Sequence, residues 1–396
     1  MNLKSHRLFI LMGTAVAAVA CAFTLHNSFV KPATVVHAAA ATSSACTFPT
    51  AVSGDDRTAW QIFVAANCPT GNVNAPLTWE TWPTQEQVFS SSSTTEAETL
   101  KSMGTGVNSS LERFHPSVLA QTLHSVETAQ PLAIAPNQCN TQTTSAVNPY
   151  TGASRSRILC EEVRMDPTAA QYVVQNKLNT LQGQGAFIQN GAKIDFPTTA
   201  IEIKADWEQN CTDTTLHTET IGGVNYCLVA MHINSKLVPD WLWATFETLS
   251  AQENPARCYS IGCTDLFGFA PAVVPSGYNS LKVRSAQKMT AQLTALETTA
   301  GLESDLAQYT LDGAQSKFLR PNGTPALLGN SVTEGELAGV PLNAASCITC
   351  HSTSNVNTSG QQNLGPLAMN MVGKAPAIPG YAPRDLSWTF IIAPQQ

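Results

Sequence analysis

The chain has 396 residues, of which 43 % are hydrophobic, and this excludes disorder as a description of the whole protein because a sizeable core can form. Charged residues make up 12 %, against about 25 % in ordinary globular domains, so neutral hydrogen-bonding side chains must form much of the surface. The formal net charge is −7; residues 1–40 hold three basic residues and no acidic one, so the remainder is three units more negative, at −10. We expect no nucleic-acid partner, since phosphate binding needs a basic surface.

Residues 1–40 have the order of a secretory signal peptide. Lys4 and Arg7 precede an apolar run from Leu8 to Phe23, and small residues follow at Ala38 to Ala41. The run is shorter than the roughly 20 residues of a spanning helix, which favours a cleaved signal over an uncleaved anchor. Acylation of Cys21, as in a lipoprotein, is the third interpretation. We therefore expect a periplasmic or secreted protein whose mature chain has no transmembrane span.

The first half of the mature chain predicts helices and extended segments in turn. Asp55 to Val64 has the polar start and apolar spacing of an amphipathic helix. Leu77 to Pro83 predicts a short strand or extended loop, whose Trp79 and Trp82 fill a core more readily than they form a binding site. The Ser- and Thr-rich stretch from Ser90 to Ser110 predicts a surface loop.

A helix is predicted to begin after Asp166, with Pro167 at its first position, and to run through Leu181 and end before Gly183. The preceding residues, Val163 to Met165, have the character of a strand end.

Strands dominate the next block, where bulky residues alternate with polar ones. The expected strands are Thr199–Trp207, Val224–Ile233 and Val238–Glu247. Tyr278 to Leu306 then has helical periodicity, whereas Gly323 to Gln396 is rich in Gly, Pro, Asn and Ser. This last segment must be ordered by something other than its own core.

Ten cysteines remain when Cys21 is set aside, an even number that suits disulfides in an oxidising compartment. If Cys347 and Cys350 serve another purpose, the other eight form sequential neighbours. The predicted bridges are Cys46–Cys68, Cys139–Cys160, Cys211–Cys227 and Cys258–Cys263.

Cys347-Ile348-Thr349-Cys350-His351 is a C-x-x-C-H motif, the attachment signature of c-type haem. Cysteines at i and i+3 lie on one side of a helical turn, so both thiols can reach the vinyl groups of one porphyrin edge. The next histidine can then bind the iron as proximal ligand. The alternatives are a redox dithiol, which expects a surrounding β-α-β pattern, and a zinc site, which needs a second ligand pair. One covalent haem c is therefore the predicted cofactor.

The Gly365-Pro366-Leu367 stretch resembles an element that follows the attachment motif in small class I cytochromes c. The resemblance implies that the Pro366 carbonyl accepts a hydrogen bond from the His351 imidazole, although the residue that usually separates the proline from the leucine is missing here. In that family a later methionine is the sixth iron ligand, and the candidates here are Met369 and Met371. Alternatives are a ligand from the N-terminal part, with His232 as the best candidate, or an open position.

Taken together, several stretches of the chain resemble a sparsely characterised group of exported bacterial cytochrome c family proteins with a single C-terminal C-x-x-C-H motif. In that group a histidine often follows the Ala-Thr-Phe-Glu stretch, where this chain has Thr248. The resemblance implies haem binding and export but no particular reaction. It is carried by Ala59–Phe63, Leu77–Trp82, Glu162–Met165, Ile201–Trp207, His232–Ile233, Trp241–Glu247 and the haem motif.

The overall expectation is an α+β protein: helices and an antiparallel sheet, with a short loop-rich haem segment packed against them. We divide it into a signal peptide (1–40), an α+β domain with disulfides (41–322) and a cytochrome c-like haem-attachment segment (323–396). The first functional hypothesis is one-electron transfer to a redox partner protein or a small-molecule oxidant or reductant. The alternatives are a haem enzyme of peroxidase or oxygenase type with an open iron site, whose catalytic residues would be unknown, and a haem-based sensor or binding module.

Overall fold

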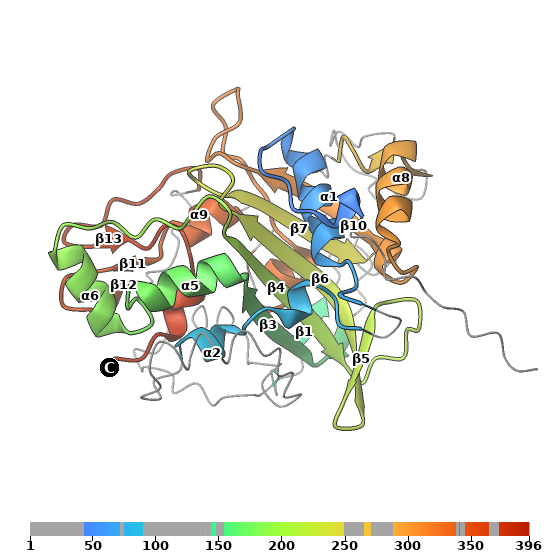
Figure 1. Cartoon of the computed structure of the whole chain (residues 1–396), viewed down its shortest axis with the longest axis horizontal. Helices are drawn as coiled ribbons and strands as arrows, with labels where there is room; N and C mark the ends of the chain where they lie inside the picture. Colours follow the sequence, from blue (N-terminus) through green and yellow to red (C-terminus); the bar gives the residue numbers. More distant parts are fainter. Residues whose placement is uncertain are drawn as a thin grey trace, which may run out of the picture. The chain divides into compact units, whose positions relative to one another are not determined.

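A computed structural model describes most of the chain from residue 43 onward (Figure 1). Helices pack against an antiparallel sheet, which confirms the α+β class expected from the sequence. The described residues are 43–71, 75–89, 139, 144–147, 154–248, 265–270, 288–337, 340, 345–363 and 372–395. The proposed signal peptide, Cys21 and the loop expected at Ser90–Ser110 lie outside these ranges.

The central sheet has the strand order β10-β7-β6-β4-β3, and every pairing is antiparallel. The short strand β5 pairs with the first residues of β6, before the part of β6 that pairs with β7. The three strands expected between 199 and 247 are all present in it. The strands are β3 (Leu159–Met165), β4 (Ile201–Gln209), β5 (Thr218–Ile221), β6 (Val224–Ser235), β7 (Leu242–Thr248) and β10 (Tyr309–Gln315).

One face of the sheet is apolar and is covered by α1 (Asp55–Ala66), the helix expected from Asp55 onward. The Phe63 ring stacks on Phe246 of β7 with a centroid distance of 4.4 Å, and Trp60 meets the same ring edge-on at 5.1 Å. The expected extended form at Trp79 is wrong: Trp79–Thr81 is a 3-10 helix. The core role of Trp79 and Trp82 is confirmed, since both are buried in this cluster.

Phe246 lies at the centre of the apolar face and is fully buried. We expect Phe246→Ala to lower the free energy of unfolding by about 3–5 kcal/mol, because the lost ring leaves a cavity beneath α1. Urea unfolding followed by tryptophan fluorescence measures the change. The control is Leu266→Ala, at a side chain that is 76 % exposed, and it should change stability by less than about 0.5 kcal/mol. Equal losses in the two variants would contradict this description of the core.

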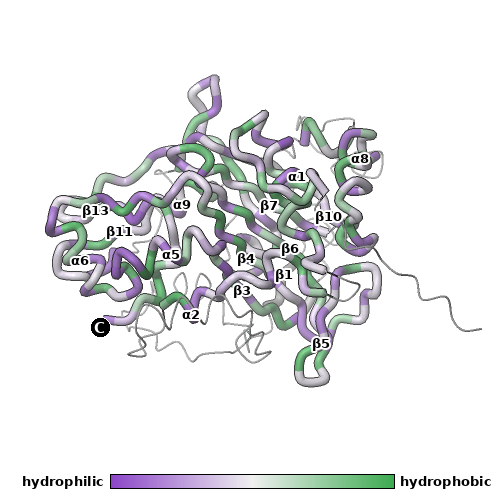
Figure 2. The backbone as a smooth tube through the Cα atoms, in the orientation of Figure 1, coloured by the Kyte–Doolittle hydropathy of each residue, from purple (hydrophilic) through white to green (hydrophobic). Residues whose placement is uncertain are grey.

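The other face of the sheet carries polar side chains that are nevertheless shielded from water. Residues paired across antiparallel strands point to the same face, and the register aligns Lys204, His232 and Thr245 in one row. Asp206 and Glu247 lie in the next row and are also buried. Apolar and polar residues thus alternate along the strands (Figure 2). An antiparallel sheet commonly exposes its polar face to solvent. In this protein the C-terminal segment covers that face instead.

The helix after Asp166 is shorter than expected. Asp166 caps α5 (Pro167–Gln175) by accepting hydrogen bonds from the Ala169 and Thr168 amides, as predicted. The chain then turns at Lys177, whose φ is 56°, and α6 (Leu181–Gln189) starts where the helix was expected to end. Gly183 therefore lies inside α6. This position in the helix needs a glycine, because a Cβ atom there would collide with the Lys177 carbonyl.

The helix expected over Tyr278–Leu306 is also shorter. Its described part is α8 (Ala291–Ala300), which Thr290 caps at the start and Gly301 ends in a left-handed conformation. A short strand precedes it, and residues 278–287 lie outside the described part. The remaining paired strands are β1 (Thr144–Val147) with β2 (Ser154–Arg157), and β8 (Phe269–Ala270) with β9 (Lys288–Met289).

The C-terminal segment packs on the polar face of the sheet. Its apolar side chains Leu328, Ile348, Val356 and Phe390 share a core cluster with the helices α2 and α5. This cluster supplies the order that the segment's own sequence does not, while the domain boundary at 322/323 stays a prediction. The elements are α2 (Gln85–Phe89), a π-helix (Ser331–Leu337), α9 (Cys347–His351), β11 (Asn355–Val356), β12 (Gln362–Asn363), β13 (Ala382–Pro383) and a 3-10 helix (Thr389–Ile392).

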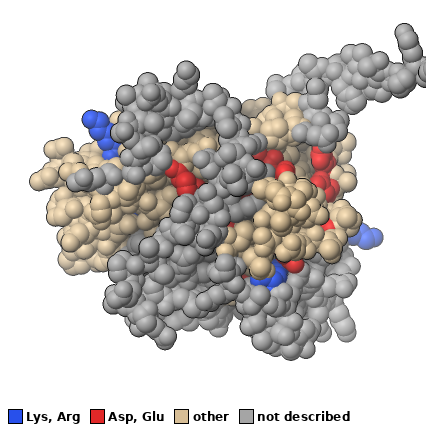
Figure 3. Space-filling view, turned by 90° about the horizontal axis from the view of Figure 1, so that it is seen from below, with Lys and Arg blue, Asp and Glu red and all other residues tan. Residues whose placement is uncertain are grey.

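Three of the four predicted disulfides are confirmed: Cys46–Cys68, Cys139–Cys160 and Cys211–Cys227. Cys258 and Cys263 lie outside the described residues. Within the described ranges, no helix is long and apolar enough to cross a membrane. Few charged side chains are seen among the described residues in the space-filling view (Figure 3), in keeping with the low charge content.

Candidate functional site

The C-x-x-C-H motif forms one short helix, α9, which is anchored at its start. The Cys347 amide donates to the Leu328 carbonyl at 3.2 Å, and the Ser346 hydroxyl donates to the Ala326 carbonyl at 2.9 Å. The Ile348 side chain is fully buried in the core cluster. These contacts fix the orientation of the helix relative to the sheet, and with it the direction of the motif's side chains.

Both thiols of the motif are free, whereas the other described cysteines are all in disulfides. Burial raises the pKa of Cys350 to about 12 and that of Cys347 well above its ordinary range, and the nearby Glu334 carboxylate adds to both effects. A dithiol-exchange motif needs a thiol that ionises readily, and these two do not. The geometry is that of two free thiols held on one turn of helix.

His351 has one ring nitrogen engaged and the other free. Its Nδ1 lies 2.9 Å from the Leu386 carbonyl oxygen, and because a carbonyl can only accept, Nδ1 must carry the proton. Among the described residues Nε2 has no hydrogen-bond partner. Burial lowers the pKa of His351 to about 3, so the ring is neutral and Nε2 has a lone pair available for a metal.

The carbonyl that orients His351 belongs to a strained turn. Asp385 and Leu386 both have positive φ, at 51° and 62°, which costs a non-glycine residue about 1–3 kcal/mol unless the surroundings enforce it. The Asp385 carboxylate accepts from Lys236 Nζ at 2.5 Å and from the Phe196 amide at 2.8 Å, and these bonds hold the turn. Pro366, expected to supply the carbonyl, lies outside the described residues; Leu386 is the acceptor seen here.

Two indole rings flank the imidazole of His351. The Trp243 ring centroid is 4.3 Å from it, and the Trp388 centroid is 5.7 Å from it. Trp243 belongs to the polar face of β7 and is fixed by a 2.9 Å bond from Nε1 to the Asp240 carbonyl. The sequence pattern places Trp243 in the expected strand Val238–Glu247, where the aromatic residues suit either a pocket wall or an ordinary core, and it gives no indication of Trp388 or Leu386.

A network of buried charges lies on the sheet face beside α9. Lys204 Nζ is 2.6 Å from Glu161 Oε2, and Asp206 accepts a hydrogen bond from Thr333. His232 Nε2 lies 3.5 Å from Glu334 Oε2. Burial raises the pKa of Asp206 to about 7. Burial also acts to raise the pKa of Glu334, but the interactions of this carboxylate with His232, the Asn330 amide and Lys204 hold its pKa below the ordinary value.

Of the residues considered for the sixth iron position, the structure describes only His232. It lies on the same face of the sheet as Trp243, and its Nε2 is turned toward Glu334. Met369 and Met371 lie outside the described residues. The identity of the sixth ligand therefore stays a prediction.

Arg384 is a buried cation beside the end of α9. Its Nε donates to the Ser354 hydroxyl at 3.0 Å, and Nη1 donates to Gln362 Oε1 at 2.8 Å and to the Phe390 carbonyl at 3.2 Å. Nη2 has no partner, and no described carboxylate lies within ion-pair distance. Burial lowers the pKa of this guanidinium to about 9, which is the response of a cation that lacks an anion.

Glu202 lies in the row of the sheet that holds Trp243, where burial raises its pKa from 4.5 to about 7 despite hydrogen bonds from Ser387 and Thr389. Because the folded state binds this proton more tightly than the unfolded chain, stability is lost as pH rises from about 4.5 to about 7. We expect Glu202→Gln to remove roughly 2–4 kcal/mol of that loss. Urea unfolding at pH 5 and pH 8 measures it; an equal drop in both proteins would contradict the prediction.

No family model, no curated protein and no solved structure matches this chain.

Proposed function

We propose that the protein is an exported c-type cytochrome with one haem attached to Cys347 and Cys350 and with His351 Nε2 as the proximal iron ligand. The observation that carries the proposal is the pairing of His351 Nδ1 with the Leu386 carbonyl, which leaves Nε2 free on the same turn as two thiols that are not in disulfides. Proximal histidines are typically held in this way, by a hydrogen bond from the ring nitrogen that does not bind the metal.

The donor set fits the group in three respects. Two neutral thiols on one helical turn suit addition to two vinyl groups, and a neutral imidazole suits iron. The unpaired Nη2 of Arg384 is a donor for an anion, and a haem propionate is an anion of the required kind. The three disulfides support export, since such bonds persist in oxidising compartments.

Bound haem supplies a one-electron couple, and the residues of this chain tune it. The Leu386 carbonyl makes the imidazole a stronger donor, which favours the oxidised iron. Trp243 and Trp388 would shield the His351 ring from water, and the hydrogen bonds that anchor the start of α9 would hold this ligand in place. These features favour an electron carrier that exchanges electrons with a redox partner protein or a small-molecule oxidant or reductant.

A haem enzyme of peroxidase or oxygenase type is the second candidate, and the buried network beside α9 favours it. Asp206, with a pKa near 7, can hold or release a proton near neutral pH, and the His232–Glu334 pair lies in the same buried network. An electron carrier has no need of such groups, whereas an enzyme acting on peroxide or oxygen does.

Absorption spectra of the purified protein, oxidised, reduced and reduced under carbon monoxide, distinguish the two. We expect a low-spin reduced spectrum that carbon monoxide leaves unchanged, because both axial positions are filled in a carrier. An immediate shift with carbon monoxide would show an accessible iron position and favour the enzyme. The absence of any haem absorption would overturn both proposals.

A further inference from the structure

A second polar cluster lies across the sheet from α9, around the buried imidazole of His217. The residue precedes β5, and its ring packs against Trp207 of the apolar face with a centroid distance of 5.9 Å. The side chains that meet it come from segments far apart in sequence: Glu80 in the 3-10 helix Trp79–Thr81, Glu219 in β5, and Asp305 before the 3-10 helix Leu306–Gln308.

The two nitrogens of His217 face different carboxylates. Nδ1 lies 3.2 Å from Asp305 Oδ2, and Nε2 lies 3.6 Å from Glu80 Oε1. Nε2 is buried and has no hydrogen-bond partner, although the residue is only 8 % exposed. One ligand atom from each of His217, Glu80 and Glu219 lies within 4.8 Å of the others. The unpartnered Nε2 thus lies beside the Glu80 carboxylate, in a group of potential ligand atoms to which Glu219 also contributes.

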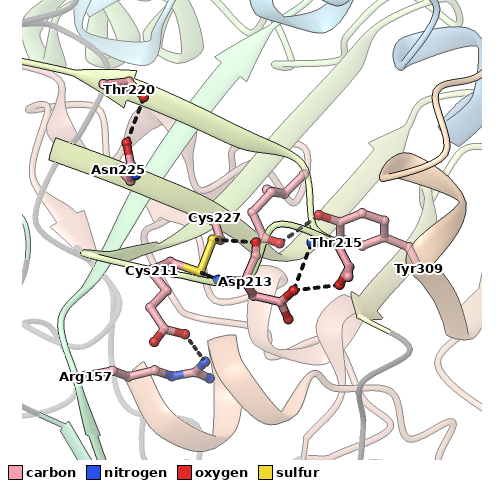
Figure 4. The surroundings of a disulfide bond; sticks show 10 residues. Arg157, Cys211, Asp213, Thr215, Thr220, Asn225, Cys227 and Tyr309 are labelled. Carbon is pink, nitrogen blue, oxygen red and sulfur yellow. Dashed lines mark hydrogen bonds and ion pairs between the residues drawn. A yellow bond between two sulfur atoms is a disulfide. The ribbon is translucent and has the colours of Figure 1, made fainter. Parts of the chain in front are cut away.

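The backbone on both sides of this cluster is braced. The Cys211–Cys227 disulfide ties the segment before His217 to β6 (Figure 4). Within that segment, the Asp213 carboxylate accepts hydrogen bonds from the Thr215 amide and hydroxyl. The His217 carbonyl accepts from the Leu228 amide at 2.9 Å. These bonds hold the imidazole in place before any ligand arrives.

Glu80 is held with similar precision. Its Oε2 accepts from the Leu77 amide at 2.8 Å, which leaves Oε1 on the side of His217. The Thr78 amide donates to the carbonyl of Cys68, which the disulfide to Cys46 fixes in turn. Glu219 and Asp305 are partly exposed, so a small ion can reach the cluster from solvent.

We propose that His217 Nε2, Glu80 and Glu219 bind a divalent transition-metal cation, with Zn²⁺ as the best match. One imidazole and two carboxylates, with water in the remaining position, is a donor set that zinc accepts, whereas Ca²⁺ and Mg²⁺ prefer oxygen ligands alone. Asp305 completes the arrangement as a positioning residue: its carboxylate accepts the Nδ1 proton and fixes Nε2 toward the metal, as in carboxylate–histidine–zinc triads.

Isothermal titration of ZnCl₂ into the chelator-treated protein tests the site. Because free thiols also bind zinc, the site is identified by variants: Glu219→Gln and His217→Gln should each weaken one zinc-binding event at least tenfold, and Cys347→Ala/Cys350→Ala should retain it. Asp305→Asn should weaken it by about 10–100-fold, as expected for an orienting partner. The matched control is Glu303→Gln, an exposed carboxylate two residues away, which should have no effect.

Zinc should also raise the melting temperature of wild type and of Glu303→Gln, but not that of Glu219→Gln, whose partly exposed side chain can change without loss of the fold. Titrations of wild type and Glu219→Gln that superimpose would overturn the proposal. So would the absence of zinc binding in the wild-type protein, because His217 would then serve only as an imidazolium paired with Glu80 and Asp305.

Discussion

The double variant Cys347→Ala/Cys350→Ala is expected to lose all covalently bound haem. Each thiol is free, and each belongs to the one turn of helix that also carries His351, so no other described cysteine can replace them. Expression with the leader in a host that matures c-type haem, followed by acid–acetone extraction, measures the covalent fraction. We expect nearly complete retention of haem in the wild-type protein and none in the double variant.

The matched control is Cys211→Ala/Cys227→Ala, which removes a disulfide at the start of β6 and leaves every residue of α9 unchanged. It should be destabilised by about 2–4 kcal/mol yet retain its haem. Retention of covalent haem by Cys347→Ala/Cys350→Ala would show that the attachment site lies elsewhere. Loss of haem from both double variants would show only that haem attachment needs the complete fold. The single variant Cys350→Ala then distinguishes direct attachment at the motif from a general loss of the fold, because it should keep haem through one thioether.

His351→Ala is expected to convert the spectrum from low-spin to high-spin, because the ring that places Nε2 is removed. Free imidazole added to this variant should restore the low-spin bands, since it can enter the space between Trp243 and Trp388. Visible absorption during an imidazole titration measures both effects. The thioethers should persist, as they depend on the thiols alone.

The control for His351→Ala is His217→Ala, another buried histidine, which lies across the sheet and should leave the spectrum unchanged. Asp385→Ala should have an intermediate effect, because it releases the turn that presents the Leu386 carbonyl to His351. A wild-type spectrum in His351→Ala would exclude this histidine as the proximal ligand.

Much of the fold follows from local patterns in the sequence. Period-two alternation predicted β4, β6 and β7, and the neighbour order of the cysteines predicted three disulfides correctly. Asp166 and Pro167 predicted the start of α5 because capping is a local property. In each case the determining interaction lies within the segment or between nearest cysteines.

Predictions failed where a distant contact decides the backbone conformation. Gly183 suggested a helix end, yet it lies inside α6 because its missing side chain lets the Lys177 carbonyl approach. The Trp79 segment forms a 3-10 turn because both indoles reach the core from that geometry. Neither contact has a signature in the neighbouring sequence.

The residues of the candidate site also fall into those that local sequence predicts and those that depend on distant contacts. Cys347, Cys350 and His351 are adjacent in sequence and their shared turn was predictable, whereas Leu386 contributes a backbone carbonyl that any residue type would provide. The burial of His232 and the partial burial of Lys204 could be predicted only by knowing which segment covers the polar face of the sheet. The cluster around His217 combines residues more than 80 positions apart, so only the folded structure could reveal it.

The most direct test of the central claim is the intact mass of the purified wild-type protein under denaturing conditions, taken together with its pyridine haemochrome spectrum. We expect a mass greater by one haem than that of the polypeptide without the proposed signal peptide, with the haemochrome of a porphyrin bound through two thioethers. A polypeptide of unmodified mass, produced in a host that attaches haem to other c-type cytochromes, would contradict it.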